Sequence, residues 1–150
     1  MAAAKTNLQL TEELLSGVSA EVIRMNNKYV EWLELAKTNP FAAFDWDYNP
    51  MELVAKLYVY REIQDWLNFA INPEKSATPE GVAHRILQEA RDRCTRYLSR
   101  GGSRSTSTID NLQEEFKAKA WAEFLEHDTF YGRAKTIHKI AQDYVDKADT

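Results

Sequence analysis

Apolar residues recur at spacings of three and four along most of the chain, which is the period of one face of an α-helix. The first such stripe follows Thr11 and consists of Leu15, Val18, Val22, Met25, Tyr29, Leu33 and Ala36. The predicted helix ends at Asn39, because the residue before a proline avoids the α region and Pro40 comes next. Residues 1–10 precede this pattern, and we expect them to form a flexible tail.

Two further helices are predicted by proline-containing starts, an Asn-Pro pair at 49–50 and a Thr-Pro pair at 78–79. In each pair a side chain that can cap a helix precedes a proline that suits the first helical position. The first stripe is Leu53, Leu57, Tyr60, Ile63, Leu67 and Ala70 or Ile71. The second stripe is Val82, Ile86 or Leu87, Ala90, Cys94, Tyr97 and Leu98. These helices should end at Asn72 and before Gly101.

Two more helices are predicted in the C-terminal third of the chain. Ser107 followed by Asp110 resembles a capping box and predicts a helix that runs to about His127. Its apolar stripe is Ile109, Leu112, Phe116, Ala120 and Phe124. Asp128 or Thr129 can cap the last helix. The stripe of that helix is Phe130, Ala134, Ile137, Ala141 and Tyr144.

The layout predicts an all-α fold, because no run of β-branched residues alternates in the way a strand requires. A length of 150 residues suits one ordinary domain. We therefore expect residues 1–150 to form a single-domain bundle of about five amphipathic helices, mostly antiparallel. Residues 99–108 form the one low-complexity stretch, and their Gly/Ser/Arg composition predicts a mobile loop.

The composition places the chain among folded globular proteins, with 44% hydrophobic and 28% charged residues. No apolar run approaches the roughly 20 residues that span a bilayer, and the N-terminus lacks the apolar core of a signal peptide. The single cysteine, Cys94, has no second cysteine with which to form a disulfide, and we expect it in the core. These features predict a cytoplasmic protein without a membrane segment.

The three histidines do not predict a metal centre. Glu123 and His127 lie four residues apart and can share a helix face, but no second histidine joins them. His84 and His138 each lie near arginine or lysine in the sequence, and a cationic neighbour opposes metal binding. We therefore expect no metal and no cofactor.

The sequence also lacks the recognisable motifs of nucleophilic catalysis and of phosphate-binding loops. The acidic residues Asp45 and Asp47 flank Trp46, so they can be interpreted as a cation site or an acid and base pair. Turn and capping chemistry explains the same pair more simply. We therefore expect no catalytic residues, and predict that the protein is not an enzyme.

A basic segment is the most informative charged feature, because the chain as a whole carries a formal charge of −4. Residues 85–104 contain six arginines, no lysine and two acidic residues, a local charge of +4. Arginine is suited to bidentate contacts with phosphate. The candidate nucleic-acid-binding residues are Arg85, Arg93, Arg96, Arg100 and Arg104, with a weaker set in Arg133 and Lys135.

Two other interpretations of the basic segment remain open. Glu89 lies four residues from both Arg85 and Arg93, so these side chains can form ion pairs along an exposed helix. Alternatively, the arginines can contact an acidic protein surface. Arg100 and Arg104 extend into the Gly/Ser loop beyond the reach of helical pairing, which favours contact with a nucleic-acid backbone.

An aromatic loop over residues 41–48 is the second candidate site. It places four aromatic residues within eight positions, and Phe44, Trp46 and Tyr48 are the candidate partner-binding residues. Such a loop either folds over the end of a bundle and closes its core or anchors a partner protein.

With this basic helix and its Ser-Arg-Gly-Gly-Ser-Arg loop, the chain resembles the small α-helical subunits of CRISPR effector complexes in size, layout and charge. That resemblance implies a non-enzymatic antiviral-defence subunit that packs with other protein subunits. It also implies contact with single-stranded nucleic acid or a guide-target duplex. The alternative is a protein-binding adaptor or regulator, such as a phage or bacterial accessory protein, that docks through the aromatic loop.

Overall fold

A computed structural model describes residues 5–45, 50–72, 77–99, 108–130 and 133–148. Within these ranges, residues 94–99, 108–111, 126–130, 133–136 and 148 are described by their backbone alone. The described residues form six helices: α1 (Asn7–Thr38), α2 (Pro40–Phe44), α3 (Pro50–Ile71), α4 (Pro79–Ser99), α5 (Thr108–Phe130) and α6 (Arg133–Ala148). The expected all-α fold is confirmed.

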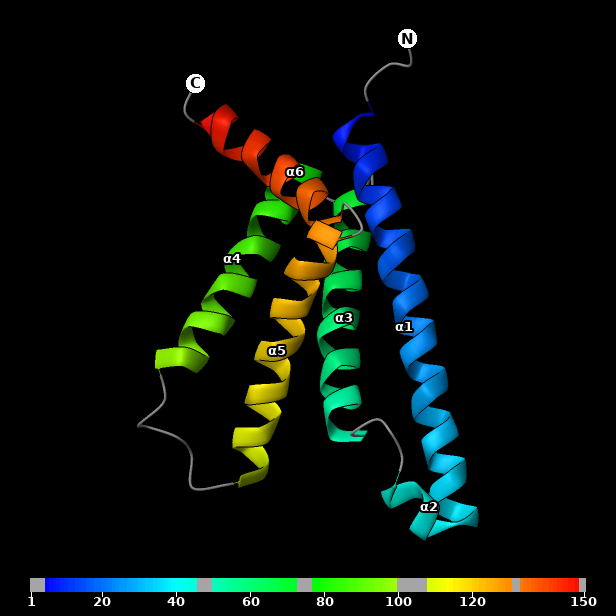
Figure 1. Cartoon of the computed structure of the whole chain (residues 1–150). Coiled ribbons are helices and arrows are strands. Elements are labelled where there is room, and N and C mark those ends of the chain that lie inside the picture. The colour runs from blue at the N-terminus through cyan, green and yellow to red at the C-terminus, as the bar shows by residue number, and fades with distance from the viewer. Residues whose placement is uncertain (1–4, 46–49, 73–76, 100–107, 131–132, 149–150) are drawn as a thin grey trace.

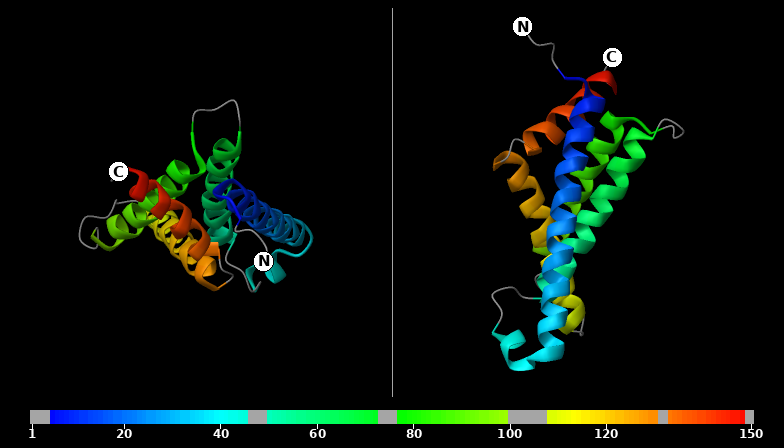
Figure 2. Two further views of the ribbon diagram at one scale, coloured as in Figure 1. Left: turned by 90° about the horizontal axis from the view of Figure 1, so that it is seen from above. Right: turned by 90° about the vertical axis from the view of Figure 1, so that its right-hand side faces the viewer.

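The four longest helices, α1, α3, α4 and α5, alternate in direction along the bundle, and α6 lies across the ends of α4 and α5 (Figure 1). Seen along the bundle, α1 lies at one edge beside α3 (Figure 2, left). The short helix α2 lies at the far end of α1, beyond the ends of the neighbouring helices (Figures 1 and 2). As a result, the part of α1 that follows Tyr29 and all of α2 extend past the shared core.

The core draws side chains from all five long helices. Its largest fully buried members are Trp121, Met25, Ile63, Leu67, Ile86, Ile137 and Ile140. The stripe predicted for α3 is buried in full from Leu53 to Ala70, because this helix is covered by α1 on one side and by α4 and α5 on the other. The side chain of Cys94 lies outside the described residues.

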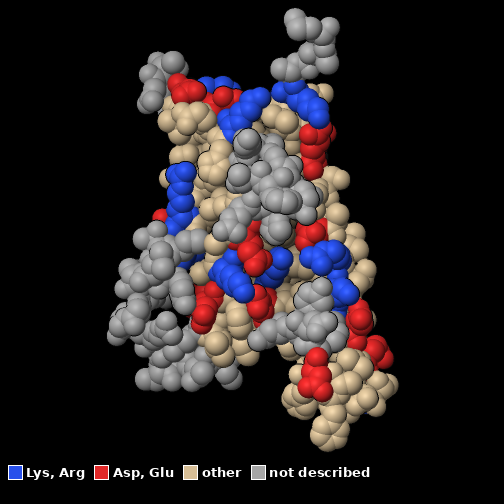
Figure 3. Space-filling view, in the orientation of Figure 1, with Lys and Arg blue, Asp and Glu red and all other residues tan. Residues whose placement is uncertain are grey.

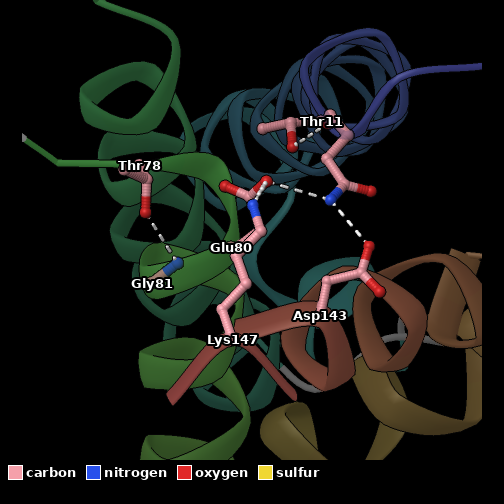
Figure 4. A network of polar contacts seen from close by, with 7 residues as sticks. Thr11, Thr78, Glu80, Gly81, Asp143 and Lys147 are labelled. Atoms are coloured by element: carbon pink, nitrogen blue, oxygen red, sulfur yellow. Dashed lines mark hydrogen bonds and ion pairs between the residues drawn. The ribbon is translucent and has the colours of Figure 1, made fainter. Parts of the chain in front are cut away.

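A polar cluster joins the starts of α1 and α4 to the end of α6 (Figure 4). The side-chain amide of Asn7 donates to Glu80 Oε1 at 3.0 Å and to Asp143 Oδ2 at 2.9 Å. Lys147 Nζ donates to the same Glu80 oxygen at 3.2 Å. The hydrogen bond from Asn7 lowers the pKa of Glu80, since it stabilises the ionised carboxylate. This cluster fixes the edge helix α1 at its N-terminal end.

Three helix boundaries differ from those expected. α1 begins at Asn7, inside the predicted tail, because Thr6 and Gln9 form a capping box. Helix α2 was not predicted; the Asn39 side chain starts it by accepting from the backbone N–H of Ala42. The predicted caps Asp128 and Thr129 are wrong: both lie within α5, which continues to Phe130.

The expected tail and loop fall largely outside what the structure describes, at residues 1–4 and 100–107. Among the helices over the described ranges, none combines the length and the apolar character that a membrane crossing requires.

Candidate interaction surfaces

Helix α2 is held against the end of α1 by one of its faces. Trp32 Nε1 donates a hydrogen bond to the backbone carbonyl of Ala43 at 3.3 Å, and Ala43 is buried. The Trp32 ring is in turn stacked with Tyr29, with ring centroids 6.4 Å apart. A helix of five residues has few positions, so burying Ala43 directs its neighbours on the opposite side into solvent.

The residues left outside are two phenylalanines. Phe41 is 83% exposed and Phe44 is 86% exposed, the highest values among the described large hydrophobic side chains. One of the two interpretations of the aromatic loop was that it closes the end of the core, and these two side chains do not do so. Trp46 and Tyr48, the other predicted partner-binding residues, lie outside the described residues.

The supporting end of α1 is itself only partly covered. Beyond Met25, no described residue of α1 is fully buried, and Tyr29, Trp32 and Leu33 are each half-buried. In Figure 3 the projecting end of the molecule, where α2 lies, is mostly uncharged. This end therefore presents apolar surface that the described residues do not cover.

The described part of the basic segment is divided between one paired and two unpaired arginines. Arg93 Nε donates to Glu89 Oε1 at 2.7 Å, and this hydrogen bond raises the pKa of Arg93. This is one of the ion pairs that the sequence left open. Arg85 and Arg91 are exposed, and neither has an ion pair with an acidic residue of the described chain.

The remaining predicted nucleic-acid-binding residues carry no structural assignment. The side chains of Arg96, Arg100, Arg104, Arg133 and Lys135 lie outside the described residues, so their role in nucleic-acid binding stays a prediction. On the face shown in Figure 3, the described positive and negative side chains alternate rather than segregate.

A groove between α1 and α3 was not expected from the sequence. It has a volume of about 600 Å³, and its lining includes Tyr29 of α1 with Val54, Tyr58, Glu62 and Asp65 of α3. The α3 residues lie on a second stripe beside the core stripe, at spacings of four, four and three. That spacing could have indicated a second face on α3, but it does not show which neighbouring helix completes the groove.

The described histidines and their neighbours make structural contacts. His84 lies against the Tyr144 ring, with centroids 4.7 Å apart, and His138 is exposed. Glu123, which we considered as a partner of His127, forms an ion pair with Lys56 at 3.2 Å. No group of three histidine, cysteine or carboxylate side chains in the described chain is arranged to hold a metal ion.

Comparison of the chain with protein-family models, with curated proteins and with solved structures gave no match.

Proposed function

We propose that this chain is a docking subunit of a larger cytoplasmic protein assembly, and that it binds a partner protein through Phe41 and Phe44. The observation that carries the proposal is the near-complete exposure of both phenylalanine rings on α2. Each aromatic side chain can bury about 150–250 Å² of surface in a contact. Two adjacent rings therefore supply a strong apolar anchor.

The way α2 is attached supports the same proposal. The Trp32 hydrogen bond to Ala43 and the Asn39 cap hold this helix in place before any partner arrives. A pre-positioned anchor loses less conformational entropy on binding than a flexible one. The projection of α2 beyond the bundle also gives a partner access from several sides (Figure 1).

The test is affinity capture from cells that contain the protein, comparing wild type with Phe41→Ser/Phe44→Ser. A partner that docks here is retained by wild type in both low and high salt, since apolar association is little affected by screening, and is lost with the double variant. Leu8→Ser/Ile23→Ser is the matched control, because it removes two exposed apolar side chains from α1 and leaves α2 intact. Equal capture by wild type and the α2 variant would contradict the proposal.

A second candidate function is contact with a nucleic-acid backbone, as the resemblance to CRISPR small subunits implies. The specific observation in its favour is that Arg85 and Arg91 project from α4 without an acidic partner among the described residues. Arginine that is not engaged in an ion pair is available for phosphate.

This candidate is tested by fluorescence anisotropy with labelled single-stranded RNA, single-stranded DNA and an RNA–DNA duplex. Binding through arginines should weaken steeply as salt rises, since it releases counterions from the phosphates. Arg85→Glu/Arg91→Glu should abolish the binding, whereas Lys5→Glu/Lys37→Glu, the same charge change on α1 and its flank, should reduce it much less. Absence of binding at low salt removes this candidate and leaves the docking proposal unaffected.

A further inference from the structure

We propose that the groove between α1 and α3 binds an amphipathic helix of another protein, one that carries lysine or arginine one to two turns from a large apolar side chain. This surface is separate from Phe41 and Phe44, so the inference goes beyond the docking function proposed above. It depends on two features of the groove, an apolar end and an acidic end whose two carboxylates, Glu62 and Asp65, form no ion pair with another described residue.

The apolar end is formed mainly by α3. Val54 and Tyr58 are 43% and 58% exposed, although they border the buried core residue Leu57. Lys117 of α5 lies over the Tyr58 ring, with Nζ 4.3 Å from the ring centroid, which favours one orientation of the ring. Tyr29 of α1 lines the same groove. An apolar side chain from a partner can therefore pack between aromatic groups that are already positioned.

The acidic end is formed by Glu62 and Asp65. Glu62 is half-buried, and among the described residues its carboxylate has neither a hydrogen bond nor an ion pair. Burial raises its pKa, although Arg93 and Lys117 are close enough to oppose that effect. Arg93 itself donates to Glu89 instead. A partly desolvated carboxylate without a partner is unfavourable, and a cation from a bound molecule would compensate it.

The third charged residue that lines the groove, Arg61, forms no ion pair with Glu62 or Asp65. Arg61 Nη2 donates to the side-chain oxygen of Asn26 at 3.2 Å, a contact that links α3 to α1 across the groove. Asp65 is exposed one turn beyond Glu62 and adds a second negative charge. The groove therefore complements an occupant with a positive charge at this end.

The spacing on α3 defines the spacing expected on the occupant. Glu62 and Asp65 lie four and seven residues after Tyr58, which corresponds to about 6 Å and about 10 Å along a helix. A helical occupant is favoured because two antiparallel helices form the walls, and a third helix can pack its side chains between theirs. Its cation should follow or precede its apolar anchor by one to two turns.

The test uses two designed 20-residue amphipathic peptides with the same leucine stripe, one with lysine and one with glutamate beside it. Binding to the full chain is measured by isothermal titration calorimetry, and the site is mapped by amide chemical-shift changes in NMR spectra. We expect the lysine peptide to bind at least about tenfold more tightly than the glutamate peptide, with shifts concentrated at residues 54–65. Glu62→Gln/Asp65→Asn should remove this preference, and Tyr58→Ser should weaken binding of the lysine peptide.

Glu12→Gln/Glu13→Gln is the control, because it removes the same charge from the exposed start of α1. If this control weakens the lysine peptide as much as Glu62→Gln/Asp65→Asn does, the attraction is general and the proposal is wrong. Failure of both peptides to bind, equal binding of both, or shifts outside the groove also overturn it. None of these outcomes bears on Phe41 and Phe44, whose capture experiment is independent.

Discussion

The indole N–H of Trp32 donates a hydrogen bond to the backbone carbonyl of Ala43, joining the end of α1 to the short helix that follows it. This contact holds α2 against the end of α1, and Ala43 is buried there. Its consequence is that the two phenylalanines on either side, Phe41 and Phe44, are left in solvent.

Replacing Trp32 with phenylalanine should loosen α2 without disturbing the bundle. The variant keeps an aromatic ring beside Tyr29 but loses the donor, and one such hydrogen bond contributes about 0.5–1.5 kcal/mol. We expect hydrogen exchange of residues 42–45 to accelerate about tenfold or less, while exchange in α3 stays unchanged. Equal acceleration in both helices would show that Trp32 supports the whole bundle rather than α2 alone.

Replacing Asn7 with alanine should destabilise the fold more than its position at a helix end suggests. The substitution removes the donor shared by Glu80 and Asp143, and leaves two half-buried carboxylates near each other. We expect the free energy of unfolding to fall by about 1–3 kcal/mol, measured by urea denaturation. Asn27→Ala, at an exposed position of the same helix, should change it by less than about 0.5 kcal/mol.

The lowered pKa of Glu80 predicts part of the acid sensitivity of the fold. Because the folded-state pKa lies below its ordinary value of 4.5, this group stabilises the protein fully above about pH 4.5. That stabilisation is lost as the pH falls through the folded-state pKa. Glu80→Gln should therefore be less stable than wild type at pH 7, and the difference should shrink at acidic pH. A difference that is constant with pH would contradict this assignment.

Glu62 should have the opposite effect on how stability depends on pH, because burial raises its pKa above 4.5. Between 4.5 and the folded-state value the folded protein binds more protons than the unfolded chain, so this group makes stability fall as the pH rises. Glu62→Gln should thus be more stable than wild type at pH 7, with a melting temperature about 1–3 °C higher. The advantage should disappear below about pH 4, which thermal denaturation at several pH values can measure.

Much of the fold followed from the sequence because each long helix carries its own signals. The Asn-Pro and Thr-Pro starts located α3 and α4, and every residue of the α3 stripe from Leu53 to Ala70 is buried. A periodic pattern identifies such a helix without knowledge of its neighbours. Helix α2 also begins with an Asn-Pro pair, at 39–40, but its five residues are too few to show an apolar period.

The sequence was less informative about which side of a helix is covered. Leu14 is buried where Leu15 was expected, and Trp121 and Ile140 are buried although neither belonged to a predicted stripe. Helices α5 and α6 each pack on more than one neighbour, so they bury more than one narrow stripe. Conversely, Leu33 continues the stripe of α1 but lies beyond the reach of the core.

The candidate sites show the same difference between what the sequence pattern predicts and what packing decides. The sequence by itself determined that residues 41–48 are rich in aromatic side chains and that residues 85–104 are rich in arginine, because composition is local. Only the tertiary structure decided that Phe44 is exposed, that Arg93 is paired with Glu89, and that Glu62 lines a groove. Exposure and pairing depend on the neighbours that packing brings to a side chain, and a helical pattern does not identify those neighbours.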